Sequence, residues 1–185
     1  MSSDDRVVRG KRRKIVGVMG GGDVDDGVAE IAEELGRRIA EAGFVLLTGG
    51  RPAGVMQAAS KGACEAGGLV VGVLPGADPD SATAWAQIVI ATNLADGRNL
   101  INVLSSDVVV ACPGGSGTLS EVAMAVKNRK PLVLLGFDPG PVVQAAEQTG
   151  LVARATSPSQ AMRLIQEFIK GQKPGEKAAP LHLEK

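Results

Sequence analysis

The sequence predicts an α/β fold, a three-layer Rossmann-like sandwich built on a doubly wound parallel sheet. Short runs rich in Val, Leu and Ile alternate with helical patterns from one end of the chain to the other. These runs are apolar at almost every position, which is typical of strands that helices cover on both faces. A chain of 185 residues is long enough for one such domain and too short for two ordinary ones.

The strands are predicted from the apolar, partly β-branched runs and the helices from apolar residues at helical spacing. The predicted strands cover residues 14–19, 44–48, 69–75, 86–91, 107–112, 131–137 and 151–155. The predicted helices cover residues 28–43, 54–67, 98–106, 118–129, 141–150 and 157–171. In the first helix Val28, Ile31, Leu35 and Ile39 share one face, and Gly43 supplies the C-terminal stop.

Right-handed crossovers bring the strand-to-helix loops of such a sheet to one edge, the carboxyl edge, where open α/β sheets bind ligands. We expect a single domain over residues 13–171. The polar segments 1–12 and 172–185 are predicted to be mobile tails.

Charge and composition narrow the range of partners. Lys and Arg together number 20, as do Asp and Glu, so no overall field favours nucleic acid or a membrane surface. One Trp, three Phe and no Tyr leave few platforms on which single-stranded nucleic acid could stack. No run has the apolar length of a membrane helix, and we expect a cytoplasmic protein. Cys64 and Cys112 lack metal-ligand spacing and are expected to be reduced and structural.

Three of the strand-exit loops are rich in glycine. Glycine lets main-chain amides approach a ligand, and the helix start that follows adds partial positive charge, so such loops bind anions. A purely structural turn is the alternative for each loop taken alone. The candidate ligand-binding residues of the three loops are Gly20, Gly21 and Gly22; Gly49, Gly50 and Arg51; and Gly114, Gly115, Ser116, Gly117 and Thr118.

Direct reading excludes the common motifs. The first loop has Asp25 where a dinucleotide fingerprint has its last glycine, and no phosphate-binding G-x-x-x-x-G-K-[ST] occurs. Thr118 stands in place of the last glycine of a nucleophile elbow. The only histidine is His182, near the C-terminus, which argues against a Ser-His triad and a histidine-ligated metal. Ser116 is therefore a candidate phosphate ligand, and we predict no metal site.

Glu121 and Arg98 are the candidates for chemistry at this edge. Glu121 lies one turn into the helix that follows the third loop, although a capping box with Thr118 explains it equally well. Arg98 could clamp a phosphate with two hydrogen bonds, as could Arg51, and each could instead be a solvated loop arginine.

The segments "TGG", "GVMQAASKGA", "GRN" and "PGGSGTLSEVAMA", in this order, resemble the LOG superfamily, some of whose members carry a misleading lysine decarboxylase label. The resemblance covers residues 15–137. Within it, "VGVMGGG", "GLVVGVLPG" and "GRNLINVLSSDVVVACPGGSGTLSE" are most similar to the molybdenum cofactor carrier protein group.

The resemblance implies two activities. LOG enzymes are phosphoribohydrolases that cleave the N-glycosidic bond of nucleoside 5'-monophosphates, with an arginine and the motif glutamate as catalytic groups, which match Arg98 and Glu121. Their arginine lies in an M-H-E-R-K stretch, whereas this chain has Asp96, Gly97 and Asn99 around Arg98. The carrier group instead holds a pterin phosphate cofactor without turnover, which this departure favours.

We therefore expect a binding protein for a nucleotide-like or molybdopterin-type phosphate ligand, held by the three loops with Arg98, Asn99, Arg51 and Glu121. No cofactor is required for a reaction, and the molybdenum cofactor or a nucleoside monophosphate is the expected ligand. A phosphoribohydrolase and a non-catalytic scaffold or sensor are the alternatives. The resemblance implies assembly as a dimer or larger, so we expect a homodimer or homotetramer. The apolar helix at 98–106 is either an interface or an ordinary core helix.

Overall fold

The structure, a computed structural model, describes residues 12–172. The predicted tails, apart from Arg12 and Gln172, and His182 lie outside the described residues. The strands are β1 (Ile15–Met19), β2 (Val45–Thr48), β3 (Val70–Leu74), β4 (Ile88–Ala91), β5 (Val108–Ala111), β6 (Leu132–Leu135) and β7 (Val152–Ala155). The α-helices are α1 (Asp26–Glu41), α2 (Gly54–Glu65), α3 (Arg98–Ser105), α4 (Ser116–Lys127), α5 (Gln144–Gln148) and α6 (Pro158–Ile169). Short 3-10 turns cover Pro79–Ser81, Ala95–Gly97 and Gly140–Val143.

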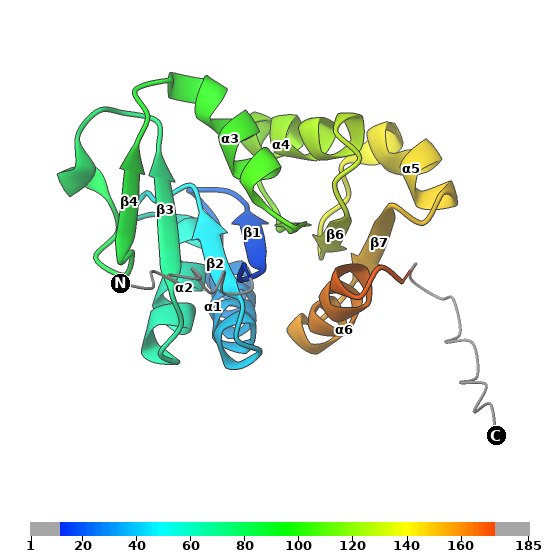
Figure 1. The fold of residues 1–185 in the computed structure, drawn as a ribbon. Coiled ribbons are helices and arrows are strands. Elements are labelled where there is room, and N and C mark those ends of the chain that lie inside the picture. The colour runs from blue at the N-terminus through cyan, green and yellow to red at the C-terminus, as the bar shows by residue number, and fades with distance from the viewer. Residues whose placement is uncertain (1–11, 173–185) are drawn as a thin grey trace, which may run out of the picture.

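The strands form one parallel sheet in the order β4-β3-β2-β1-β5-β6-β7, between two layers of helices (Figure 1). Helices α1, α2 and α6 cover one face, while α3, α4 and α5 cover the other. The chain winds outward from β1 in one direction and, after β4, crosses to β5 and winds outward in the other. The predicted doubly wound, three-layer fold is confirmed.

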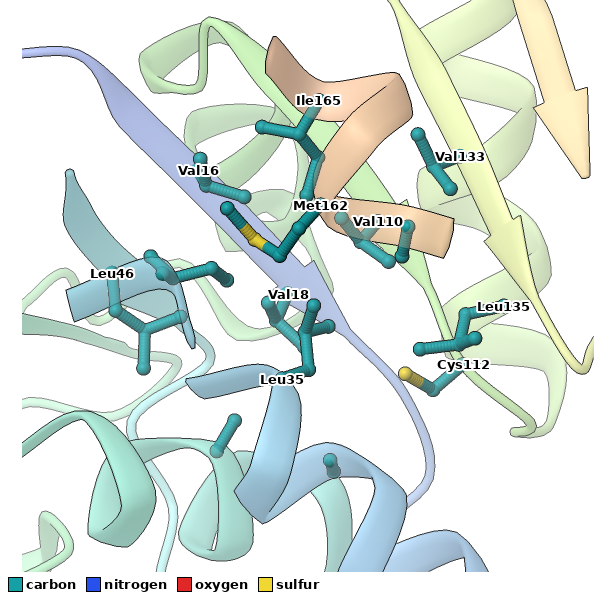
Figure 2. Packing of buried hydrophobic residues seen from close by; sticks show 14 of the residues in the cluster. Val16, Val18, Leu35, Leu46, Val110, Cys112, Val133, Leu135, Met162 and Ile165 are labelled. Atoms are coloured by element: carbon teal, nitrogen blue, oxygen red, sulfur yellow. The ribbon is translucent and has the colours of Figure 1, made fainter. Parts of the chain in front are cut away.

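The core consists of aliphatic side chains on both faces of the sheet. On one face Val16 and Val18 of β1 pack with Leu35 of α1 and Met162 and Ile165 of α6 (Figure 2). Cys112, at the end of β5, is fully buried in the same cluster, and burial raises the pKa of its thiol to about 12. Cys112 and Cys64 are both free thiols, as expected.

Helices α1 and α2 meet at two glycines. A Cβ on Gly36 would collide with the Ala59 carbonyl oxygen, and one on Gly62 would collide with that of Glu33. The two backbones are therefore in direct contact. This contact rotates α1 so that its buried face runs through Ala32, Leu35, Gly36 and Ile39, whereas Ile31, predicted to share that face, is 37% exposed.

Strand β4 departs from the expectation that apolar strands are buried on both faces. Ile88 and Ile90 are both exposed, because β4 lies at the edge of the sheet and the helices on their side cover its neighbours. None of the helices in residues 12–172 has the length and apolar character needed to cross a membrane.

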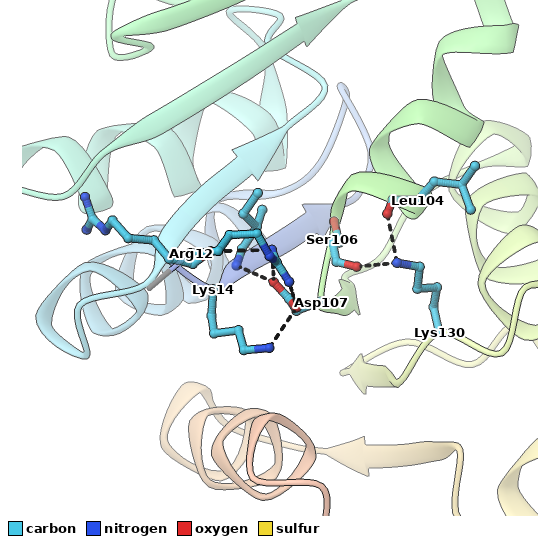
Figure 3. A network of polar contacts seen from close by, with 8 residues as sticks. Arg12, Lys14, Leu104, Ser106, Asp107 and Lys130 are labelled. Carbon is cyan, nitrogen blue, oxygen red and sulfur yellow. Dashed lines mark hydrogen bonds and ion pairs between the residues drawn. The ribbon is translucent and has the colours of Figure 1, made fainter. Parts of the chain in front are cut away.

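At the amino edge of the sheet a polar network closes the start of β1 and β5 (Figure 3). Asp107 accepts hydrogen bonds from both Nη atoms of Arg12, at 2.6 and 2.9 Å, from Lys14 Nζ at 3.1 Å and from the amide of Ile15 at 2.9 Å. Lys130 Nζ donates to the carbonyl oxygens of Leu104 and Ser106, each at 2.8 Å. The C-terminal end of α3 is thereby capped by a lysine.

Candidate anion-binding site

A cavity of about 300 Å³ opens at the carboxyl edge, where β1 and β5 lie side by side and the chain winds away in opposite directions. Ligands of doubly wound sheets bind at this point. The amide of Gly21 donates to the carbonyl oxygen of Pro113 at 2.9 Å, and this hydrogen bond joins the loops that follow the two strands. The loops after β1, β2 and β5 and the start of α3 all contribute to the cavity wall.

The N-terminus of α4 points at this cavity. The helix begins at Ser116, two residues before the predicted start, so Ser116, Gly117 and Thr118 form its first turn. Gly115 precedes it as the N-cap, with no capping side chain. Among residues 12–172 no oxygen accepts a hydrogen bond from the amides of Ser116, Gly117 and Thr118. Together with the helix dipole, these amides can hold an oxyanion.

Two glycines keep this helix start open to a ligand. A Cβ on Gly115 or on Gly117 would meet no atom of residues 12–172 within 4 Å, although both residues line the cavity. Neither residue has a positive φ, so conformational strain does not explain the choice of glycine. The missing side chains leave space directly beside the amides, and a ligand can use that space.

Arg98, the first residue of α3, places in the cavity wall a cation that has no ion-pair partner among the described residues. The residue is 9% exposed, and its guanidinium occupies the space that a side chain on Gly49 would need. Its Nε has no hydrogen-bond partner among the described residues. Burial lowers the pKa of the guanidinium, against the field of Glu121, and Arg51 adds repulsion. Glu121 and Asp96 offset part of this buried charge, and a bound anion would stabilise it further.

Arg51 and Asp96 flank Arg98 in the same cavity. Arg51 Nη2 lies beside Gly22, 3.2 Å from the place of a Cβ on that glycine. Asp96, in the turn before α3, acts on Arg98 through space only. The cavity therefore combines two arginines, one aspartate and a helix N-terminus.

Glu121 is the buried carboxyl group of the site. It is 6% exposed, lines the cavity, and accepts a hydrogen bond at Oε1 from Asn102 Nδ2 at 3.0 Å. Burial raises the pKa of Glu121 to about 7, because the hydrogen bond from Asn102 and the field of Arg98 offset only part of the lost hydration. The capping box with Thr118 is wrong, since Thr118 is inside the first turn and Glu121 bonds to α3 instead.

Most of the predicted site residues come together around this cavity. Those in its wall are Gly20, Gly21, Gly22, Gly49, Arg51, Arg98, Asn99, Gly115, Ser116, Gly117, Thr118 and Glu121. The amide of Gly21 is already used by Pro113, so this glycine contributes shape only.

Gly50 and Gly114 are not in the wall, and both have structural roles instead. Gly50 has a φ of +74° and donates its amide to Thr48 Oγ1 at 3.2 Å. Gly114 packs against the Gly21 amide and the Thr118 side chain, where a Cβ would not fit.

The sequence analysis missed four apolar residues and one aspartate of the wall, and one polar residue behind the wall. The cavity is also lined by Val18, Met19, Met56, Pro75 and Asp96. Asn102 lies behind Glu121 and carries no motif. Its only signal is its place four residues after Arg98, on the same helical face. No group of three or more His, Cys, Asp or Glu residues suited to a metal occurs within residues 12–172.

The fold and its glycine-lined cavity define a Rossmann-like protein of the LOG superfamily, as the sequence resemblance implied. The chain belongs to the SLOG cluster4 family, whose profile matches residues 13–162.

The molybdenum cofactor binding protein of the phototrophic bacterium Rippkaea orientalis is 46% identical in sequence, with a TM-score of 0.81 over 86% of this chain and 99% of that chain. The molybdenum cofactor carrier protein of Chlamydomonas reinhardtii is 43% identical, with a TM-score of 0.79 and the same coverage. A cytokinin riboside 5'-monophosphate phosphoribohydrolase of Rhodococcoides fascians is 31% identical over 115 residues, which make up 57% of this chain and 58% of that protein.

Proposed function

We propose that this protein binds a phosphate-bearing, nucleotide-like ligand without turning it over, and that its cargo is the molybdenum cofactor. One observation carries the proposal: the open amides of α4 and the buried, unpaired Arg98 face the same cavity. No oxygen of residues 12–172 accepts a hydrogen bond from these amides or from Arg98 Nε, and an anionic group of a ligand would serve both. The similarity to two proteins described as binding or carrying the molybdenum cofactor supports this cargo.

Different residues of the cavity wall contact different parts of the proposed ligand. The amides of Ser116, Gly117 and Thr118 are placed to receive the phosphate, because a helix N-terminus favours a dianion. Arg98 and Arg51 supply compensating charge across the cavity. Met19, Met56 and Pro75 give the ligand an apolar surface. A volume of about 300 Å³ lies at the lower end of the range for small-molecule pockets.

A phosphoribohydrolase is the second candidate. The observation that favours it is Glu121, whose pKa of about 7 suits proton transfer near neutral pH, close to the charge of Arg98. A carboxylate here could also stabilise an oxocarbenium-like transition state. One observation argues against this function. The His, Glu and Lys that surround the arginine in LOG enzymes are replaced here by Asp96, Gly97 and Asn99. A binding protein does not need them.

We also propose that the protein forms a homodimer or homotetramer in the cytoplasm. Helix α3 carries Leu100 and Leu104 on its outer side, at 39% and 49% exposed, next to the site residues of its inner side. A scaffold or sensor that only assembles, with no ligand, is the third reading.

The test of ligand binding uses a matched pair of glycine variants. Gly117 and Gly27 are each the second residue of their helix, α4 and α1, and only Gly117 lines the cavity. Gly117→Ala should weaken the binding of inorganic phosphate at least tenfold in isothermal titration calorimetry, because the methyl group fills the space beside the amides. Gly27→Ala should not. Both should fold with slightly higher stability, since alanine favours helix.

A second experiment separates the carrier from the hydrolase and the scaffold. Mass spectrometry of gently purified protein should find bound molybdopterin, whereas a scaffold would carry nothing. Incubation with AMP should release no adenine or ribose 5-phosphate. If the wild type hydrolyses AMP and Glu121→Gln does not, the protein is a hydrolase and the carrier proposal is wrong.

A further inference from the structure

Asn102 of α3 is a polar residue with no exposed surface, next to the aliphatic cluster beneath α3 and α4. Its Nδ2 donates to Glu121 Oε1 at 3.0 Å and lies 3.8 Å from the sulfur of Met19. Its Oδ1 has no hydrogen-bond partner among residues 12–172. An unsatisfied buried amide oxygen costs stability, and a leucine of similar size would avoid that cost. Packing alone therefore does not explain an asparagine here.

Joining α3 to α4 does not require Asn102 either. One turn earlier on α3, Asn99 Nδ2 donates to Ser120 Oγ at 2.9 Å, and Ser120 Oγ donates to the carbonyl oxygen of Gly117 at 2.7 Å. Asn99 thus already connects the two helices through neutral groups. What distinguishes Asn102 is that its partner is a carboxyl group of the cavity wall.

The contact leaves the two oxygens of Glu121 in different positions. Oε1 is held by Asn102. Oε2 accepts no hydrogen bond from the described residues. It is also not one of their fully buried polar atoms that lack a partner, so it is accessible from the cavity that Glu121 lines. Arg98 is the charged group that acts on Glu121, and Arg51 and Asp96 line the same cavity.

We propose that Asn102 is a positioning residue, which holds Oε1 of Glu121 so that Oε2 is presented to the cavity as the acceptor for an N–H or O–H donor on the body of the ligand. This inference rests on the proposed function. It adds that the ligand carries such a donor beside its phosphate, as a sugar hydroxyl or a 2-amino-4-oxopyrimidine edge would supply. Inorganic phosphate has no such body and would not use the contact.

The first test needs no ligand. Asn102→Leu removes the one hydrogen bond that the carboxyl group of Glu121 accepts from residues 12–172, so the pKa of Glu121, followed by ¹³C NMR of its side-chain carboxyl carbon, should rise by a unit or more. The signal is assigned with Glu121→Gln. Asn99→Leu is the matched control for the pKa, because it breaks an α3–α4 hydrogen bond that does not involve Glu121. An unchanged pKa in Asn102→Leu, or an equal change in Asn99→Leu, would overturn the inference.

A second measurement covers the case in which Asn102→Leu does not fold. In the wild-type protein the side-chain amide protons of Asn102 should shift with pH at the same midpoint as the Glu121 carboxyl carbon. Amide protons that ignore this titration would also overturn the inference.

The ligand arm of the test uses GMP, which carries both ribose hydroxyls and a 2-amino-4-oxopyrimidine edge, against inorganic phosphate. At pH 8 Asn102→Leu should weaken GMP binding about tenfold and leave phosphate binding within twofold, as expected for one lost charge-assisted contact. Equal losses for both probes, or a wild type that binds GMP no better than phosphate, would contradict the donor contact. If the wild type binds neither probe, the proposed function fails, while the NMR result still decides whether Asn102 positions Glu121.

Discussion

The carboxyl groups at the two edges of the sheet differ in their hydrogen-bond partners, and their pKa values are shifted in opposite directions. At the amino edge, the Asp107 carboxylate accepts hydrogen bonds from Arg12, Lys14 and the amide of Ile15. These partners hold the pKa of Asp107 at about 2, although partial burial acts against them. At the carboxyl edge, the carboxyl group of Glu121 accepts one hydrogen bond from the described residues, from the neutral Asn102, and burial raises its pKa to about 7. Among residues 12–172, donors reach both oxygens of the Asp107 carboxylate and one oxygen of the Glu121 carboxyl group.

This difference shows that the incompletely hydrogen-bonded charged groups of the pair of edges lie at the carboxyl edge. Both carboxyl groups belong to the same β5-α4 unit, Asp107 just before the strand and Glu121 in the helix after it. A carboxylate with full partners contributes to stability, whereas perturbed and incompletely paired groups cluster at functional sites. Arg98, also at the carboxyl edge, strengthens the contrast, because its Nε has no acceptor among residues 12–172.

The largest expected effect comes from removing Arg98. Arg98→Met should weaken phosphate binding about a hundredfold or more, because loss of a buried cation opposite a bound anion costs about 3 kcal/mol. At pH 6 the same variant should be about 1 kcal/mol more stable to urea than the wild type, since a buried unpaired charge disappears. A variant that loses both binding and stability would mean that Arg98 has a structural partner. The carboxyl edge would then not differ from the amino edge in leaving charged groups unpaired.

The second effect concerns pH dependence at the carboxyl edge. The pKa of Glu121 is raised in the folded state, so the folded protein binds the extra proton, and the free energy of unfolding should fall as the pH rises from about 4.5 to about 7. Glu121→Gln should remove this slope and be about 2 kcal/mol more stable than the wild type at pH 8. Urea titrations of both proteins from pH 4 to pH 8 measure it, and parallel curves would contradict the prediction.

The smallest effect is expected at the amino edge, with the opposite sign. Because the pKa of Asp107 is lowered, its contribution is complete above about pH 4 and is lost as the pH falls through about 2. Asp107→Asn should cost about 1 kcal/mol at pH 7, a value reduced for the solvent exposure of Arg12, and the difference from the wild type should shrink toward pH 2 and vanish below it. Phosphate binding should not change. A loss of binding would show that the two edges are coupled.

Much of the fold could be predicted because the strands and helices are read from local patterns. The strand expected at residues 14–19 is β1, and the last predicted helix, at 157–171, is α6 within two residues at each end. The start of α4 was placed two residues late, since Thr118 and Glu121 resemble a capping box and only tertiary contacts show that Glu121 turns toward α3. The exposure of β4 depends on the order of strands in the sheet, which no local run of residues encodes.

The candidate site was predictable where it depends on motifs and not where it depends on packing. Gly115 and Gly117 were found from the loop sequence, and both line the cavity. Gly50 and Gly114 lie in the same kind of glycine-rich loop, but their contacts show that they have structural roles. Asn102 was missed because a buried asparagine on an amphipathic helix has no signature until its partner is known.

The glycine contact between α1 and α2 has a consequence for the speed of ligand capture. Gly36 and Gly62 bring the two backbones together, and the loops that precede these helices carry Gly22 and Arg51. Two walls of the cavity are therefore anchored to one pair of packed helices, and we expect little loop entropy to be lost when a ligand arrives. Capture should then approach the rate of diffusional encounter, and the residence time alone would set how long a cargo stays bound.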